Sequence, residues 1–192
     1  MPQTLDLNKH SPIKDELYFV DSNVWFWTTY VTSKHMALPQ PPQEYQTSTY
    51  PAFLEKILNE GAKLCHCPLT LAELANVIEN TELDFYREAI NNIHFEKKAF
   101  RQKKDARQTV LKEIEVAWET MNSMSKCLDI KLDLTFSENS RKIMAEGTVD
   151  PFDAFFIQVM RDNKIDYVVT DDRDFCTVNK QIVITANRKA LK

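Results

Sequence analysis

Short apolar runs alternate with amphipathic stretches along the chain, and this alternation predicts the order of strands and helices. The strand candidates are 17–20, 62–67, 128–136, 167–170 and 181–185. The helix candidates are 51–60, 68–80, 84–126 and a segment that starts at Pro151. Because strands alternate with helices, the sequence predicts an α/β fold with a central, mainly parallel sheet flanked by helices.

Residues with known preferences at helix ends sharpen these boundaries. Pro51 is suited to the first position of a helix that stops at Gly61. Thr70 and Glu73 have the spacing of a capping box. Residues 33–50, which contain three prolines, are predicted to be a loop or an ordered insertion.

Acidic side chains occupy the ends of two predicted strands. One apolar run ends directly in Asp21, and another ends in the acids of 171–174. The carboxyl ends of parallel strands meet at one edge of a sheet, where ligand sites gather. Glu73 and Asp153, each expected in the first turn of a helix, should lie at that edge too. The sequence therefore predicts that acids from distant parts of the chain converge on one point.

Converging carboxylates repel one another and persist only if proton uptake or a cation offsets the repulsion. A set of oxygen ligands without His or Cys favours Mg²⁺ or Mn²⁺ over Zn²⁺. Such an ion suits phosphate-ester chemistry. Each acid also has a structural interpretation: a turn or cap for Asp21 and 171–174, the capping box for Glu73, and the helix dipole for Asp153.

Composition limits the alternatives. The length of 192 residues fits a single domain, 1–192. A polar N-terminal stretch and the lack of long apolar runs predict a cytoplasmic protein without a membrane span. With two glycines, at 61 and 147, no Gly-rich phosphate loop can be written. The CHC stretch at 65–67 is tighter than the usual zinc ligand pair, and its alternative interpretation is a strand with small apolar cysteines.

The net charge of −4 does not suggest nucleic-acid binding, but one segment is strongly basic. Residues 97–107 read KKAFRQKKDAR, with Phe100 as an aromatic side chain for base stacking. The alternative is a solvated helix face. The candidate nucleic-acid-binding residues are Lys97, Lys98, Arg101, Lys103, Lys104 and Arg107.

Four segments in order resemble the PIN-domain nucleases, a family that includes the VapC-like toxin ribonucleases. They are FVDSNV, TLAELANVIE, DPFDAFFIQVM and YVVTDDRDF, which together span residues 19–175. The resemblance implies a Rossmann-like three-layer fold and a metal-dependent ribonuclease that uses Mg²⁺ or Mn²⁺. The implied catalytic and metal-binding acids are Asp21, Glu73, Asp153 and Asp172, with Asp174 as a further metal ligand and Ser22, Asn23 and Thr170 as polar supports.

The resemblance also implies partners. Many bacterial members are toxins held inactive by an antitoxin, so an RNA substrate, an antitoxin and a homodimer are all expectations. The chain is longer than a typical toxin of the family, in 33–50 and in an extended helical insertion around 84–126. Asp150 competes with Asp153 as the third acid, although an N-cap role is sufficient for Asp150.

Other classes fit the sequence less well. The four histidines lie in no nucleophile context, and G-x-S-x-G is absent. A phosphoaspartyl enzyme would carry an acid two residues after Asp21, where Asn23 stands, and a receiver domain would place its acid pair after the first strand. The remaining alternatives are a PIN-like DNA or structure-specific nuclease, and a PIN-like binding module with weak catalysis.

Overall fold

The computed structural model describes residues 3–34 and 38–191, in which six strands form one sheet with every neighbouring pair parallel. The strands are β1 (Gln3–Asp6), β2 (Leu17–Val20), β3 (Lys63–His66), β4 (Ser125–Cys127), β5 (Tyr167–Val169) and β6 (Ile182–Thr185). Their order across the sheet is β1-β6-β5-β2-β3-β4. The predicted parallel α/β fold is therefore confirmed. The strand order changes direction at β2, which lies between β5 and β3.

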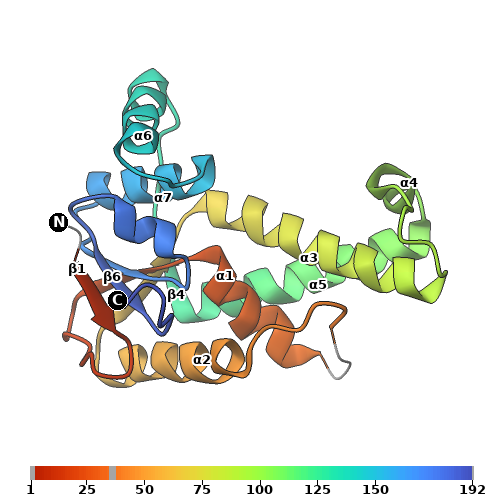
Figure 1. The fold of residues 1–192 in the computed structure, drawn as a ribbon, viewed down its shortest axis with the longest axis horizontal. Helices are drawn as coiled ribbons and strands as arrows, with labels where there is room; N and C mark the ends of the chain where they lie inside the picture. The colour runs from red at the N-terminus through yellow and green to blue at the C-terminus, as the bar shows by residue number, and fades with distance from the viewer. Residues whose placement is uncertain (1–2, 35–37, 192) are drawn as a thin grey trace.

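Side chains of the four central strands β2, β3, β5 and β6 alternate between two apolar clusters, one on each face of the sheet. In β2, Tyr18 and Val20 belong to one cluster and Phe19 to the other. The helices are α1 (Ser22–Trp25), α2 (Glu44–Asn59), α3 (Pro68–Ala89), α4 (Lys97–Arg101), α5 (Lys104–Met124), α6 (Leu134–Glu146) and α7 (Pro151–Asp162). Buried residues of α2, α3 and α5 pack on the first face, and those of α6 and α7 on the second, which gives three layers (Figure 1).

Helices α3 and α5 pack side by side and extend together away from the sheet, with α4 near their outer end (Figure 1). We call α4 and the outer halves of α3 and α5 the arm. The expected insertion at 84–126 corresponds to it, although it comprises the end of α3, a connection, α4 and α5 rather than one helix. Its own small core contains Leu83, Phe100 and Val110.

A buried acid holds the arm together. Glu79 of α3 is only 5% exposed and is surrounded by cations from α4 and α5. Arg101 Nε donates to Glu79 Oε1 at 2.7 Å, and Lys97 Nζ and Arg107 Nη1 lie 3.0 and 3.1 Å from the carboxylate. The hydrogen bonds from Arg101, together with Lys97, lower the pKa of Glu79 to about 2. The charge of Glu79 therefore ties α4 and α5 to α3.

One helix begins earlier than predicted. Helix α2 starts at Glu44, not at Pro51, so the C-terminal part of the expected 33–50 loop is helical. Gln43 and Gln46 form a reciprocal cap that fixes the earlier start. Pro51 is consequently inside the helix, where it removes one backbone donor. The prediction that the helix stops at Gly61 is confirmed, because α2 ends at Asn59 and Gly61 has φ +78°. Within the 33–50 prediction, residues 35–37 lie outside the described residues.

The capping box predicted for Thr70 and Glu73 is wrong. Helix α3 begins at Pro68, so Cys67 is the N-cap and Thr70 is its reciprocal partner. Thr70 Oγ1 accepts from the backbone N–H of Cys67 at 3.3 Å. Glu73 is therefore in the second turn of the helix, where it has no capping role.

The strand that weak alternation predicted at 128–136 is also wrong. The strand in this region is β4, which pairs with β3 and ends at Cys127. Asp133 then caps α6 by accepting from the N–H of Phe136 at 2.9 Å. The alternating residues instead precede and begin α6, a helix that the pattern did not predict. The apolar pattern did not predict β1 either, because this strand lies in a polar stretch at the edge of the sheet.

Two further observations bear on the sequence predictions. In the described ranges, no helix is long and apolar enough to span a membrane. Cys65 is a buried member of the core in β3, and all four cysteines are free.

Replacing Glu79 by Gln should destabilise the arm, because three cations lose their common carboxylate. A hydrogen bond to a charged group contributes about 1.5–3 kcal/mol, and chemical denaturation near neutral pH should show a loss of this order. Glu88→Gln, an exposed change on the same helix, is the matched control. The Glu79 contribution should be present above pH 4.5 and be lost as the pH falls towards 2, because the folded-state pKa is lowered. Equal stability of the two variants would contradict this role.

Candidate functional site

A cavity of about 330 Å³ opens at the carboxyl edge of the sheet, beside β2, where the strand order changes direction. The four acids expected to converge all line it: Asp21, Glu73, Asp153 and Asp172. Asp150 lines it too, with Ser22 and Asn23 beside it. The topology thus brings together side chains that are separated by as many as 151 positions in the sequence.

Asp21 is the most rigidly held of these acids. It directly follows β2, is 3% exposed, and its backbone N–H donates to the carbonyl of Val169 in β5 at 3.1 Å. Its Oδ2 accepts from Thr170 Oγ1 at 2.6 Å and from Asn23 Nδ2 at 2.7 Å. Its Oδ1 accepts from the backbone N–H of Ser22 at 2.6 Å. The three residues expected to support the acids therefore all contact Asp21.

Glu73 faces the cavity from the second turn of α3. Its Oε2 is buried and has no hydrogen-bond partner among the described residues. Asn23 Oδ1, on the same cavity wall, is likewise buried without a partner there. Two acceptor oxygens without donors are unusual in a folded protein and suit a cation.

Asp153 and Asp150 share the first turn of α7. Asp150 is the N-cap: its Oδ1 accepts from the N–H of Asp153 at 2.9 Å. Asp153 is 6% exposed and receives only a long contact, 3.4 Å, from the N–H of Asp150. The N-cap role expected for Asp150 is confirmed, and Asp153 retains more of its carboxylate for the cavity.

Asp172 and Asp174 follow β5. Asp172 Oδ1 accepts from the N–H of Asp174 at 2.8 Å, and its own N–H donates to Thr170 Oγ1 at 2.9 Å. Asp174 does not line the cavity; its Oδ1 accepts from Thr148 Oγ1 at 3.0 Å. The structure therefore places Asp172 with the converging acids and Asp174 behind it.

Burial and mutual repulsion raise the pKa values of the cavity acids. The pKa of Asp21 rises to about 6, chiefly through burial, and that of Glu73 to about 7 through burial and the charge of Asp21. The pKa of Asp153 rises to about 9, through burial and then the charges of Asp21, Asp150, Asp172 and Glu73. Near neutral pH, bound protons on these carboxyl groups, above all on Asp153, thus offset the repulsion that a cation would otherwise offset.

The donor set fits a hard cation, because it consists of oxygens and includes two acceptors without partners. However, in residues 3–34 and 38–191 no group of three or more His, Cys, Asp or Glu side chains is placed so that it could hold a metal ion. The acids line a common cavity but do not form a closed cage.

Trp27 and Phe26 also line the cavity, which the sequence pattern did not predict. They come from the π-helical turn Phe26–Tyr30 that continues α1. Trp27 lies four residues after Asn23, so helical spacing was the available signal for it. Trp25, by contrast, is fully buried in the core.

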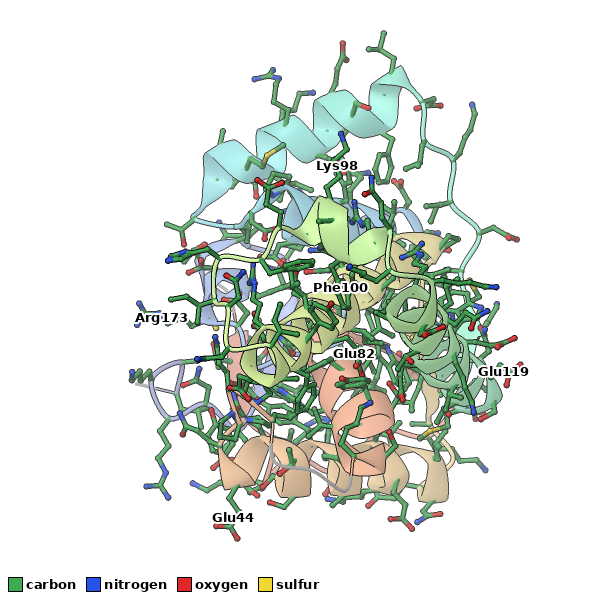
Figure 2. The ribbon with its side chains drawn as sticks, turned by 90° about the vertical axis from the view of Figure 1, so that its right-hand side faces the viewer. Glu44, Glu82, Lys98, Phe100, Glu119 and Arg173 are labelled. Atoms are coloured by element: carbon green, nitrogen blue, oxygen red, sulfur yellow. The ribbon has the colours of Figure 1, made fainter. Side chains whose placement is uncertain are left out.

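The basic segment has two kinds of residue. Lys97, Arg101 and Arg107 bind Glu79, whereas the other three cations make no ion pair with another described residue. Phe100 is 2% exposed and lies on the side of α4 that faces α3 and α5 (Figure 2), so it is not available for base stacking, contrary to expectation. The exposed cations of this segment without an ion-pair partner among the described residues are Lys98, Lys103 and Lys104.

Comparisons with known proteins agree with this architecture. A family model described as "PIN domain" matches residues 46–181. Among solved structures, the chain is similar to the crystal structure of VapBC2 from Rickettsia felis bound to a DNA fragment from their promoter. The TM-score is 0.50 and the identity 14%, over 88% of this chain and 98% of that chain. No curated protein matches the sequence.

The raised pKa of Asp153 predicts that the acid cavity lowers the stability of the fold increasingly as the pH rises. A carboxyl whose folded-state pKa exceeds its unfolded value stabilises the fold below the unfolded pKa, and this stabilisation is lost as pH rises towards about 9. In chelator, the free energy of unfolding of Asp153→Asn relative to wild type should therefore increase from pH 5 to pH 9. Asp129→Asn, at an exposed position, should show no such trend. A constant difference for Asp153→Asn would mean that burial and the neighbouring acids do not raise the pKa of Asp153.

Proposed function

The chain belongs to the PIN domain family, and from this premise we propose that it is an endonuclease that cleaves single-stranded RNA with Mg²⁺ or Mn²⁺. Its family consists of nucleases, which supports phosphodiester hydrolysis as the reaction. The observation that carries the proposal is the convergence of Asp21, Glu73, Asp153 and Asp172 in one cavity. Their charges repel one another, and no described residue that lines the cavity is Lys, Arg or His.

The acids would hold the metal ion, which supplies a counter-charge for the phosphate and lowers the pKa of a bound water. Asp21 is suited to be the fixed ligand, because Thr170, Ser22 and Asn23 hold its two oxygens in place. Glu73 offers an oxygen that no hydrogen bond occupies. Asp153 and Asp172 add two further carboxyl groups from the C-terminal part of the chain. The backbone N–H of Asp174 donates to Asp172 and supports its position.

The arm is a proposed contact surface for RNA. Three of its six candidate cations are engaged by Glu79, so the proposal rests on Lys98, Lys103 and Lys104, which are exposed. Figure 2 shows Lys98 on the side of α4 opposite Phe100. Exposed cations of this kind contact phosphates without reading sequence.

We further propose that an antitoxin protein inhibits the enzyme. The support is the structural similarity to VapBC2. In addition, many bacterial members of the family are toxins that an antitoxin holds inactive. If a small reading frame adjoins the gene, its product expressed together with the chain should co-purify and suppress cleavage. Cleavage that continues at full rate with the co-expressed product would contradict this regulation.

Asp21→Asn should abolish RNA cleavage while the fold persists, because the amide keeps the shape of the carboxylate but removes its charge. Cleavage of a labelled single-stranded RNA is measured with Mg²⁺ or Mn²⁺, and the melting curve reports folding. Asp129→Asn is the matched Asp-to-Asn control and should cleave at the wild-type rate. Single-stranded DNA is tested in parallel, because cleavage of DNA rather than RNA would favour the DNA nuclease alternative. Full activity of Asp21→Asn, or of wild type in excess chelator, would refute the assignment.

A further inference from the structure

Three cavities adjoin one another along the carboxyl edge of the sheet. The acid cavity shares Asn23, Trp27 and Asp172 with a second cavity of about 390 Å³. The second shares Asp171, Asn187 and Lys189 with a third of about 550 Å³. We call the second and third cavities the tail groove, because residues after β6 form one wall. The shared lining residues connect the groove to the acid cavity.

The exposed charge of the tail groove is basic. Its lining includes Arg173, Arg188 and Lys189, all exposed. None of these three makes an ion pair with another described residue of the chain. Arg173 lies at the left margin of the molecule in Figure 2, on the opposite side from Glu119. Within the described residues, these cations therefore have no internal partner to neutralise them.

Asp171, the acid of this groove apart from Asp172, is already occupied. Its carboxylate accepts from Tyr50 Oη at 2.7 Å, Gln46 Nε2 at 2.8 Å and Tyr45 Oη at 2.9 Å. These donors all come from α2. Asp171 is therefore engaged within the fold, as Asp21 is, whereas Glu73 keeps an oxygen without a partner among the described residues.

The same network fixes the position of the tail. Asn187 Nδ2 donates to the carbonyl of Asp171 at 2.8 Å, and the N–H of Ala186 donates to Tyr50 Oη at 3.0 Å. The N–H of Lys189 in turn donates to Asn187 Oδ1 at 3.0 Å. The backbone that carries Arg188 and Lys189 is thus held beside the groove before any ligand binds, which reduces the entropic cost of binding.

We propose that the tail groove binds the sugar-phosphate backbone of a single-stranded nucleic acid on one side of the bond cut at the acid cavity. The inference rests on the proposed nuclease function and adds a substrate-binding path to it. A nucleic acid has many phosphates along its backbone, so one can enter the acid cavity with its counter-ion while others meet Arg188 and Lys189. The half-buried ring of Tyr45 lines the third cavity and provides an aromatic surface along the way. An acidic protein segment could also bind the cations, but the cavity carboxylates would repel its acidic side chains.

The test compares two double variants with the same change of charge. Arg188→Gln with Lys189→Gln removes two groove cations, and Arg141→Gln with Lys142→Gln removes two exposed cations of α6 that line none of the three cavities. Binding of a fluorescein-labelled oligouridylate is followed by anisotropy in chelator, over a range of KCl concentrations. The slope of log affinity against log salt should decrease by about 0.7 for each phosphate that the protein no longer neutralises. The groove variant should show about twice this decrease, because it lacks both cations, and the α6 variant should keep the wild-type slope.

Two outcomes would overturn the groove assignment. One is an unchanged slope in the groove variant, provided that its melting curve shows a folded protein. The other is displacement of the oligouridylate by polyglutamate as effectively as by unlabelled oligouridylate, which would point to an acidic protein partner. Metal-dependent cleavage by wild type is measured separately: if wild type cleaves and the slopes do not differ, only the groove is wrong. If the slopes differ but no RNA or DNA is cleaved with any metal, the proposed function is wrong and the groove remains a binding site.

Discussion

The parallel alignment of β2 with β5 is the constraint on which the rest of the structure depends. Residues 18–20 of β2 lie in register with 167–169 of β5, so the residues that follow the two strands emerge side by side. Asp21 and Thr170 are among them, and they share a hydrogen bond of 2.6 Å. With β3 on the opposite side of β2, the beginning of α3 reaches the same edge. A shift in this register would separate the acids and remove the cavity.

This arrangement concentrates negative charge, and the fold tolerates it because other interactions are favourable. Apolar clusters on both faces of the sheet stabilise the strands from which the acids emerge. Three donors hold Asp21, while Glu73 and Asp153 are left to repel their neighbours. Glu79 shows the opposite arrangement, since three cations surround one buried acid. The contrast between the lowered pKa of Glu79 and the raised pKa of Asp153 separates a structural acid from a candidate functional one.

Local patterns predicted those features whose causes are local. The apolar runs ending in Asp21 and in 171–174 indicated the strand ends, and Asp150 with Pro151 indicated the start of α7. Local patterns failed where the local signal was weak and where distant contacts decide. Pro51 indicated a helix start because the Gln43–Gln46 cap that begins α2 earlier has no strong sequence signature. The hydrogen bonds between Asp171 and α2, and the cations around Glu79, join residues far apart in sequence, so no local pattern revealed them.

The central claim is that the cavity acids bind a divalent cation together. Calorimetric titration of Mn²⁺ into the metal-free protein tests it directly, with Glu73→Gln as the variant and Glu88→Gln as a control on the same helix. Glu73 is informative because its Oε2 has no partner among the described residues that the substitution would disturb. Wild type and Glu88→Gln should bind Mn²⁺ with the same affinity, and Glu73→Gln should bind it at least tenfold more weakly, a difference of about 1.4 kcal/mol. Equal affinity of all three proteins, or no binding by wild type, would contradict it.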